Sequence, residues 1–409
     1  MTADGDRPRP RFARFYERIT EAMDRQGLSE LRAELLADLH GTVVEIGCGN
    51  GRNFAHYPAT VTAVHAIALP PTTHRAGQPS RARLRLPTMT RREGEAVPED
   101  GAVLDVVVVG GGVGGLSAAL MLARARRRVV CVDAGSPRNA PAGHVHGFLS
   151  REDTSPRELS AIGGEDVTRY GGELLTGTTS RIVAEEHRGF AGELADGRRL
   201  TARAVVVATG LHDELPPIPG LSERWGRTVL HCPYCHGYEV RDAPLIVVGG
   251  PNRPFTMHQV QLVRQWSPEV AFVPNGIDLD DTERERFAAR RIEILDRPVR
   301  GVVDHHEAPV AVELGDDQTV PCTAVFVGPR FVPRDELLAE LGCARDEAGA
   351  IAVDPTGQTS VAGVWAVGNV VRDTQAIVSA ASGATAGIAI NHYLLAQDID
   401  RAVIDHQVS

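Results

Sequence analysis

The sequence has few cysteines, an excess of negative charge and no long apolar run, and each of these features argues against a class of protein. Its 409 residues include six cysteines, and only Cys232 and Cys235 are close together, so we do not expect a secreted disulfide framework. The formal net charge of −10 argues against nucleic acid as a partner. No stretch approaches the roughly 18 apolar residues of a membrane span, and the polar N-terminus lacks the apolar region of a secretory signal. We therefore expect a cytoplasmic protein without a membrane or nucleic-acid partner.

The strongest backbone motif is a glycine loop between a strand and a helix. A β-branched run at 105–109 enters a G-x-G-x-x-G loop at 110–115, which is followed by an alanine- and leucine-rich helix predicted at 116–127. The next predicted strand ends at Asp133, whose carboxylate can accept a hydrogen bond from a ribose hydroxyl. Strand, glycines, helix, strand and acid in this register predict a dinucleotide site. The simpler alternative is a glycine turn that only packs tightly.

A second motif, Cys232-Pro233-Tyr234-Cys235-His236, carries sulfur chemistry. One thiolate of a C-x-x-C pair can attack a partner disulfide while the other resolves the mixed disulfide. His236 follows directly and is a candidate proton donor or acceptor. A zinc site would need a second ligand pair at zinc spacing, which the sequence lacks, so we predict no metal. A glutaredoxin has its cysteines after the first strand of a small domain, whereas here they come after a dinucleotide motif.

The order of these motifs resembles the low-molecular-weight thioredoxin reductases, which are pyridine nucleotide–disulfide oxidoreductases. The resemblance covers about residues 103–397 and includes an Ala-Thr-Gly strand end at 208–210 and a late Gly-Asn segment at 368–369. It implies that Cys235 lies against a flavin, that Cys232 exchanges with substrate, and that FAD is the cofactor. Asn369 replaces the Asp that is usual in the family. The FAD-binding residues implied are Gly110, Gly112, Val113, Gly114, Gly115, Asp133, Ala208, Thr209, Gly210, Gly368, Asn369, Gln375 and Ala376.

The predicted fold class is α/β, with two Rossmann-like three-layer dinucleotide-binding domains and an incomplete N-terminal α/β fragment. A helix is predicted at 375–395 within the first domain. The family resemblance also implies a homodimer and, as partner, a thioredoxin-like protein or a small dithiol or disulfide. The predicted division is a fragment at 1–66, a Pro/Arg-rich linker at 67–102, a discontinuous FAD-binding domain at 103–217 and 326–400, and an NAD(P)-binding-like domain with the cysteine pair at 218–325.

Two departures from the family pattern leave the electron partner open. His236 stands where thioredoxin reductases carry an acidic residue. This substitution is more similar to the dithiol oxidases of natural-product pathways, which pass electrons to oxygen. The second glycine motif keeps Gly249 and Gly250 as candidate NADPH-binding residues. Pro254 lacks an N–H group, and Phe255 is bulky where a third small residue is needed. The sequence thus predicts either an NADPH-linked reductase or an oxygen-using oxidase without NADPH.

The N-terminal fragment resembles part of a different family. The segment 43–51 is similar to the first motif of class I S-adenosylmethionine-dependent methyltransferases. About 65 residues are too few for that fold, so we expect an inactive remnant, with Met89 as the original start of the flavoprotein. A methyltransferase with an accessory flavin domain and a non-enzymatic redox sensor are the alternatives from other classes.

Overall fold

The computed structural model describes residues 34, 36–46, 56–67, 103–186, 188–372 and 375–408. The chain divides into two compact units, Met1–Glu93 and Gly94–Ser409, and each is described by itself. Within the described ranges, no helix combines the length and apolar character that a membrane span requires.

The described residues of the N-terminal unit include a pair of strands. β1 (Gly41–Ile46) and β2 (Val61–Ile67) pair in parallel. The glycine segment 47–51, which suggested a methyltransferase motif, lies outside the described residues. The methyltransferase resemblance therefore stays a prediction.

The second unit begins with a parallel sheet that carries the first glycine loop. β3 (Leu104–Val109) lies between β4 (Val129–Asp133) and β8 (Arg199–Val207). The apolar residues of β3 are almost fully buried, as expected for a central strand covered on both faces. The sheet extends through β5 (Glu173–Thr176) beside β4, and through β19 (Val364–Ala366) beside β8.

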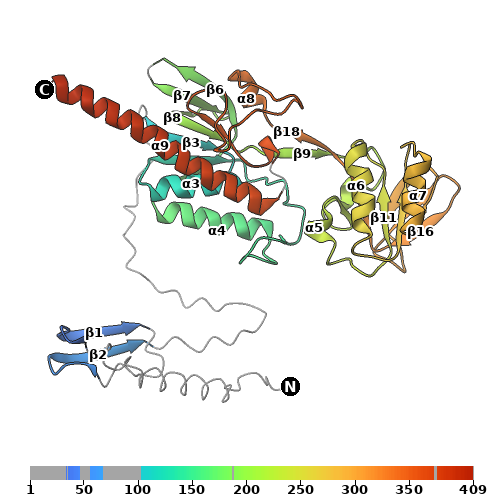
Figure 1. The fold of residues 1–409 in the computed structure, drawn as a ribbon, viewed down its shortest axis with the longest axis horizontal. Helices are drawn as coiled ribbons and strands as arrows, with labels where there is room; N and C mark the ends of the chain where they lie inside the picture. The colour runs from blue at the N-terminus through green and yellow to red at the C-terminus, as the bar shows by residue number, and fades with distance from the viewer. Residues whose placement is uncertain are drawn as a thin grey trace. The chain divides into compact units, whose positions relative to one another are not determined.

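Apolar cores lie on both faces of this sheet, which continues from β8 into the antiparallel strands β7 (Gly189–Leu194) and β6 (Thr179–Glu185). Val106 and Val108 of β3 face the helical core, where α3 and α9 lie side by side (Figure 1). Val107 and Val109 face the opposite core, to which β6, β7 and α8 (Glu336–Glu340) also contribute. The helices of the helical layer are α3 (Val113–Arg124), α4 (Pro156–Arg169) and α9 (Ala376–Val408).

Two predicted helix boundaries were wrong. The helix predicted at 375–395 continues as α9 to Val408, because no glycine or proline interrupts residues 396–408. Asp398 in this extension pairs with Arg127 at 2.6 Å and with Arg203 at 2.7 Å. The helix predicted from residue 116 begins at Val113, since two glycines of the loop already belong to its first turn.

A second Rossmann-like domain follows, built on a five-stranded parallel sheet in the order β10-β17-β11-β12-β13. One core joins this sheet to its helices, and another joins it to a three-stranded antiparallel sheet. The elements are β10 (Val229–Leu230), α5 (Pro233–His236), β11 (Leu245–Val248), α6 (Arg253–Val263), β12 (Val270–Val273), α7 (Asp281–Ala289), β13 (Ile292–Ile294), β14 (Val299–Val303), β15 (Val310–Leu314), β16 (Thr319–Cys322) and β17 (Ala324–Val327).

Two short antiparallel strands join the two domains. β9 (Leu211–Glu214) leaves the first domain and β18 (Arg330–Pro333) returns to it, and both lie between the two sheets (Figure 1). The 3₁₀ turns η3 (Ser222–Arg224) and η4 (Gly368–Val371) complete the described elements. The predicted α/β class with two dinucleotide-binding-type domains is confirmed, while the predicted domain boundaries stay predictions.

Close packing of α9 on α3 gives a testable requirement for glycine. A Cβ atom at Gly383 would lie 1.9 Å from the carbonyl oxygen of Gly114, so the helices would have to separate. We expect Gly383→Ala to lower the free energy of unfolding by about 1–3 kcal/mol, measured by chemical denaturation. Gly143→Ala is the control, because a Cβ there meets no atom within 4 Å. Equal stability of the two variants would contradict this packing.

Candidate active site

The first glycine loop combines crowding on one side with open space on the other. A Cβ at Gly110 would lie 2.3 Å from the carbonyl oxygen of Ala208, and one at Gly115 would lie 1.9 Å from that of Gly110. These two glycines therefore allow the close turn and the close helix–strand packing that the motif predicts. A Cβ at Gly112 would meet nothing within 4 Å, so a ligand can approach the backbone there.

The helix that starts at this loop keeps its N-terminal donors available. Gly112 is the N-cap residue of α3, no side chain caps the helix, and its first turn has no acidic residue. Unsatisfied N–H groups and the positive end of the helix dipole suit a pyrophosphate. Asp133 lies at the end of β4, where its carboxylate accepts hydrogen bonds from the backbone N–H of Gly111 at 2.9 Å and of Gly135 at 3.1 Å.

A cavity of about 670 Å³ extends from this loop to the cysteine pair. Every residue predicted to bind FAD lines it except Gly115, which lies behind the loop in the helix packing. Cys235 and His236 line the same cavity. Its volume is within the range of cofactor pockets, and its glycine backbone suits a dinucleotide. The residues present therefore fit FAD, although their individual binding roles stay predictions.

The cysteine pair forms a disulfide at the start of a one-turn helix. Cys232 is the N-cap of α5, Pro233 is in its first turn, and Cys232 is bonded to Cys235 with a Cα–Cα distance of 5.2 Å. A Cβ at Gly237 would lie 2.8 Å from the Trp266 ring, so this position needs a glycine. Both cysteines are partly exposed.

The remaining described cysteines have no comparable access. Cys131, Cys322 and Cys343 are buried free thiols. Burial raises the pKa of Cys131 and of Cys322 to about 12, so both stay protonated at neutral pH. Among the described cysteines, these three thiols are thus less accessible than the partly exposed Cys232 and Cys235.

Two histidines flank this disulfide in different electrostatic settings. Burial lowers the pKa of His231 to about 3, and the charge of Arg138 acts in the same direction. Burial also lowers the pKa of His236, and the positive charge of His146 adds to this effect, whereas Glu239 opposes it. Both rings are therefore biased toward the neutral form, and a neutral His236 can accept a proton.

A partly buried arginine that the sequence patterns did not reveal connects the two domains. Arg138 donates to both carboxylate oxygens of Asp213 on β9, at 2.9 and 2.6 Å. It also lies 3.2 Å from Nε2 of His231, and its guanidinium lies 5.3 Å from the centre of the Phe331 ring on β18. Because arginine can only donate, Nε2 of His231 accepts and this ring is neutral. The His231 ring stacks on Trp225 at 5.4 Å.

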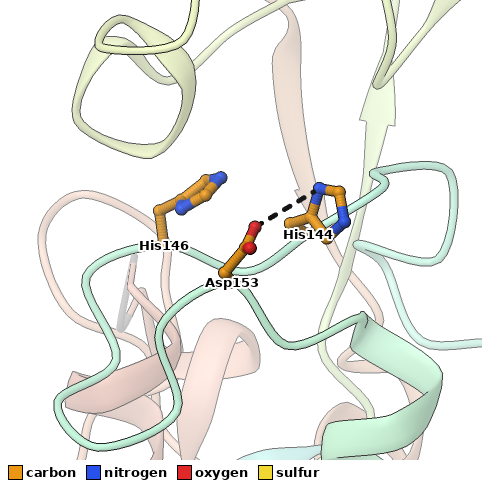
Figure 2. Close-up of side chains that lie close together, drawn as sticks. All are labelled: His144, His146 and Asp153. Atoms are coloured by element: carbon orange, nitrogen blue, oxygen red, sulfur yellow. Dashed lines mark ion pairs between the residues drawn. The ribbon is translucent and has the colours of Figure 1, made fainter. Parts of the chain in front are cut away.

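A loop after β4 brings further ionisable groups to the cavity. His144, His146 and Asp153 lie together there, with ligand atoms within 4.8 Å of one another (Figure 2). Nδ1 of His144 is 3.7 Å from Asp153, and the side chains of both are more than half exposed. His144 and His146 line the cavity with Cys235. The only sequence signal for this group was the His-x-His spacing, which a surface loop can also show.

The second glycine loop differs from the first in its capping. A Cβ at Gly249 would lie 1.9 Å from the carbonyl oxygen of Pro274, so this glycine serves packing. Asn252 caps α6, and its side chain accepts from the N–H of Phe255 at 3.2 Å. Pro254 has no N–H to offer. Two of the first-turn donors that a phosphate would use, those of residues 254 and 255, are thus removed or already bonded.

Side chains also fill the space beside this second loop and neutralise the nearby positive charge. The Phe255 ring packs edge-on against Phe331 at 5.3 Å, and Arg253 pairs with Glu283 at 2.8 Å. A Cβ at Gly250 would lie 2.2 Å from the Gly328 carbonyl oxygen. Neither Gly249 nor Gly250 lines the 670 Å³ cavity. This loop therefore presents fewer free backbone donors to a phosphate than the first loop does, and the nearby positive charge is already paired.

Two Rossmann-like domains with a glycine loop and a disulfide on one cavity define a class of dinucleotide-binding oxidoreductases. Residues 104–253 and 258–386 match the pyridine nucleotide-disulphide oxidoreductase family, and the chain belongs to this family. Within it the relatives are thioredoxin reductase-like, a group that typically binds FAD and NADPH.

Solved and curated relatives cover most of the second unit. The crystal structure of HlmI is 47% identical, has a TM-score of 0.72, and covers 75% of this chain and 98% of its own. An oxidoreductase from Agrobacterium tumefaciens is 34% identical, with a TM-score of 0.67 and coverage of 72% and 99%. Thioredoxin reductase sirT of Leptosphaeria maculans is 28% identical over 318 residues, which is 73% of this chain and 96% of that protein.

The pairing of Arg138 with Asp213 predicts a large loss of stability when it is broken. The two side chains are only 17% and 6% exposed, so Arg138→Met leaves a buried carboxylate without its partner. We expect a loss of about 3–5 kcal/mol in the free energy of unfolding, measured by urea denaturation.

Arg330 on β18 and Glu214 on β9 provide an exposed control pair, which shares strand β9 with Asp213. Their side chains are 61% and 48% exposed, and Arg330→Met should change stability by less than about 1 kcal/mol. If the Arg138 variant were as stable as the Arg330 variant, the pair would not hold the domains together.

Proposed function

We propose that this protein is an FAD-dependent thiol–disulfide oxidoreductase. Electrons pass between FAD, the Cys232/Cys235 pair and an external dithiol or disulfide. The observation that carries the proposal is that Cys235 and His236 line the same cavity as the uncapped glycine loop. A redox-active sulfur and a dinucleotide cradle in one cavity suit electron transfer between them.

The glycine loop, the Ala-Thr-Gly strand end and the late Gly-Asn segment would hold FAD. When bound, FAD would supply a two-electron acceptor to the cavity that Cys235 lines. The residues that would hold it are Gly110, Gly112, Val113, Gly114, Gly115, Asp133, Ala208, Thr209, Gly210, Gly368, Asn369, Gln375 and Ala376.

The two cysteines take different roles in the proposed exchange. Cys235 lines the cavity and is the sulfur on the cofactor side, whereas Cys232 does not line it and is free to meet an external thiol. His236 accepts the proton of the attacking thiol, because burial favours its neutral form. The side chains of Tyr234 and Tyr238 are each 64% exposed and offer an aromatic surface to a small dithiol or a thioredoxin-like protein.

The capping of α6 favours an external dithiol over NADPH as the electron donor. Asn252 uses the Phe255 N–H and Pro254 has none, so the phosphates of NADPH would find few donors. The favoured form of the proposal is therefore a dithiol oxidase. In the complete reaction, the dithiol gives up two electrons and two protons, and dioxygen accepts both to form hydrogen peroxide.

An anaerobic titration of the purified yellow protein tests this proposal. Dithiothreitol should bleach the flavin absorbance to an extent proportional to the amount of cysteine pair present. NADPH at the same concentration should leave the absorbance unchanged. Admission of air should restore the absorbance and yield one hydrogen peroxide per dithiol consumed. Bleaching by NADPH would favour the reductase, and no bleaching by either reagent would exclude the proposed exchange.

Serine variants provide the control. Cys232→Ser and Cys235→Ser should each retain the flavin spectrum and lose rapid bleaching by dithiothreitol, because neither can form the internal disulfide. Bleaching at the wild-type rate in both variants would mean that the dithiol reduces the flavin directly.

A further inference from the structure

The loop between β4 and α4 brings two imidazoles and a carboxylate together. His144, His146 and Asp153 each offer a ligand atom, and these atoms lie within 4.8 Å of one another. Figure 2 shows the Asp153 carboxylate between the two rings. The group contains no cysteine and lies outside the C-x-x-C motif, for which no metal is predicted. The proposed electron transfer uses none of these three residues.

The backbone of this loop explains why the three side chains lie on one side of it. An antiparallel bridge joins Val145 to Thr154, and the N–H of Val145 donates to the Thr154 carbonyl at 2.8 Å. Side chains alternate along a bridged strand, so the buried Val145 points one way, and His144 and His146 point together to the other side. In an antiparallel pair, the residue after Val145 lies across from the residue before Thr154, which is Asp153.

Glu152 determines which nitrogen of the His146 ring is available to an ion. Nδ1 of His146 donates to Oε1 of Glu152 at 2.8 Å, and the N–H of Gly147 donates to the other carboxylate oxygen at 2.9 Å. Because a carboxylate only accepts, the neutral ring carries its hydrogen on Nδ1 and its lone pair on Nε2. Histidines that bind metal ions are commonly oriented by a carboxylate in this way. The side chain of His146 is 14% exposed, so the ring is confined as well as oriented.

The charges around this group favour a cation. In the part of the chain that the structure describes, the ion pairs of Glu152, Asp153 and Glu239 are all with histidine rings, and no arginine pairs with these carboxylates. Neutral imidazoles do not balance their charge. Oε1 of Glu239 lies 3.7 Å from Nε2 of His146, so a further carboxylate borders the lone pair of this ring. A divalent cation there would be surrounded by negative charge.

The ligand types and distances suit zinc. Zn²⁺ binds imidazole nitrogen and carboxylate oxygen at about 2.0–2.2 Å, so two ligand atoms of a tetrahedral ion are roughly 3.3 Å apart. Nδ1 of His144 lies 3.7 Å from Oδ1 of Asp153. The side chains of these two residues are 57% and 73% exposed and have room to close the remaining distance. Three protein ligands leave the fourth position of such an ion to water.

We propose that His144, His146 and Asp153 form a binding site for Zn²⁺. His146 binds through Nε2, and Glu152 holds its ring in place. Both histidines line the cavity that Cys235 also lines, so the ion lies at the wall of this cavity. The site is independent of the proposed electron transfer, because no cysteine and no predicted FAD-binding residue belongs to it.

Equilibrium dialysis of the oxidised holoenzyme against micromolar free Zn²⁺ tests the site, with bound zinc counted by elemental mass spectrometry. The protein is kept oxidised so that Cys232 and Cys235 stay in their disulfide and offer no thiolate. We expect His144→Gln and Asp153→Asn each to bind one zinc ion fewer per chain than the wild type. Both positions are more than half exposed, so these variants should fold, which an unchanged flavin spectrum verifies.

A variant of the orienting carboxylate and a matched histidine pair refine the test. Glu152→Ala should lower the zinc affinity by about 10–100-fold, which is the usual cost of removing the partner of a ligating histidine. His305 and His306 provide the control, because they lie beside Glu307 and offer similar residue types. Among the described residues, these side chains do not converge as a group of three ligands. His305→Gln combined with His306→Gln should bind zinc as the wild type does.

X-ray absorption at the zinc edge identifies the ligands directly. We expect nitrogen and oxygen neighbours at about 2.0–2.2 Å, with scattering from imidazole rings, and no sulfur neighbour at about 2.3 Å. A sulfur neighbour would place the zinc on cysteine and overturn the assignment. Equal zinc content in the wild type, His144→Gln and Asp153→Asn would also overturn it, as would an equal loss in the control double variant.

Discussion

A guanidinium group that is shielded from water needs a negatively charged partner. The junction of the two domains depends on the ion pair that Arg138 forms. Its bidentate contact with Asp213 joins the loop after β4 to the connecting strand β9. Its third contact, with His231, holds the residue immediately before Cys232. The residue before the disulfide thus contacts a largely buried charge pair, and removing one partner would leave the other without its counter-charge.

The two glycine loops show how similar sequence patterns acquire different chemistry. Both need glycine for the close approach of neighbouring backbone, as the short Cβ distances at Gly115 and Gly249 require. They differ in the helix that each loop enters, because α3 leaves its first N–H groups uncapped, whereas Asn252 caps α6. The glycines of such a loop indicate only how tightly the turn packs. The capping residue of the following helix indicates whether a phosphate can bind at the helix N-terminus.

Patterns that rest on local chemistry could be predicted from the sequence, and contacts between distant segments could not. The run 105–109 was recognisable as a central strand because β-branched residues suit a buried sheet, and the C-x-x-C spacing brings its own sulfurs together. Arg138, His146 and Asp213 belong to no motif, since their partners lie elsewhere in the chain. The length of α9 was underestimated although residues 396–408 contain no helix breaker, and the ion pairs of Asp398 with Arg127 and Arg203, which hold the start of this extension, could not be read from the sequence.

The small size of the ring closed by Cys232 and Cys235 has a consequence for the fold as a whole. The two cysteines are three residues apart, so their bond restricts the unfolded chain very little. On the chain-entropy account such a crosslink contributes about 2 kcal/mol, against nearly 5 kcal/mol for a loop of about 100 residues. Breaking this bond would therefore remove little of the stability, most of which comes from the packed sheets. The disulfide is largely separate from the interactions that keep the protein folded.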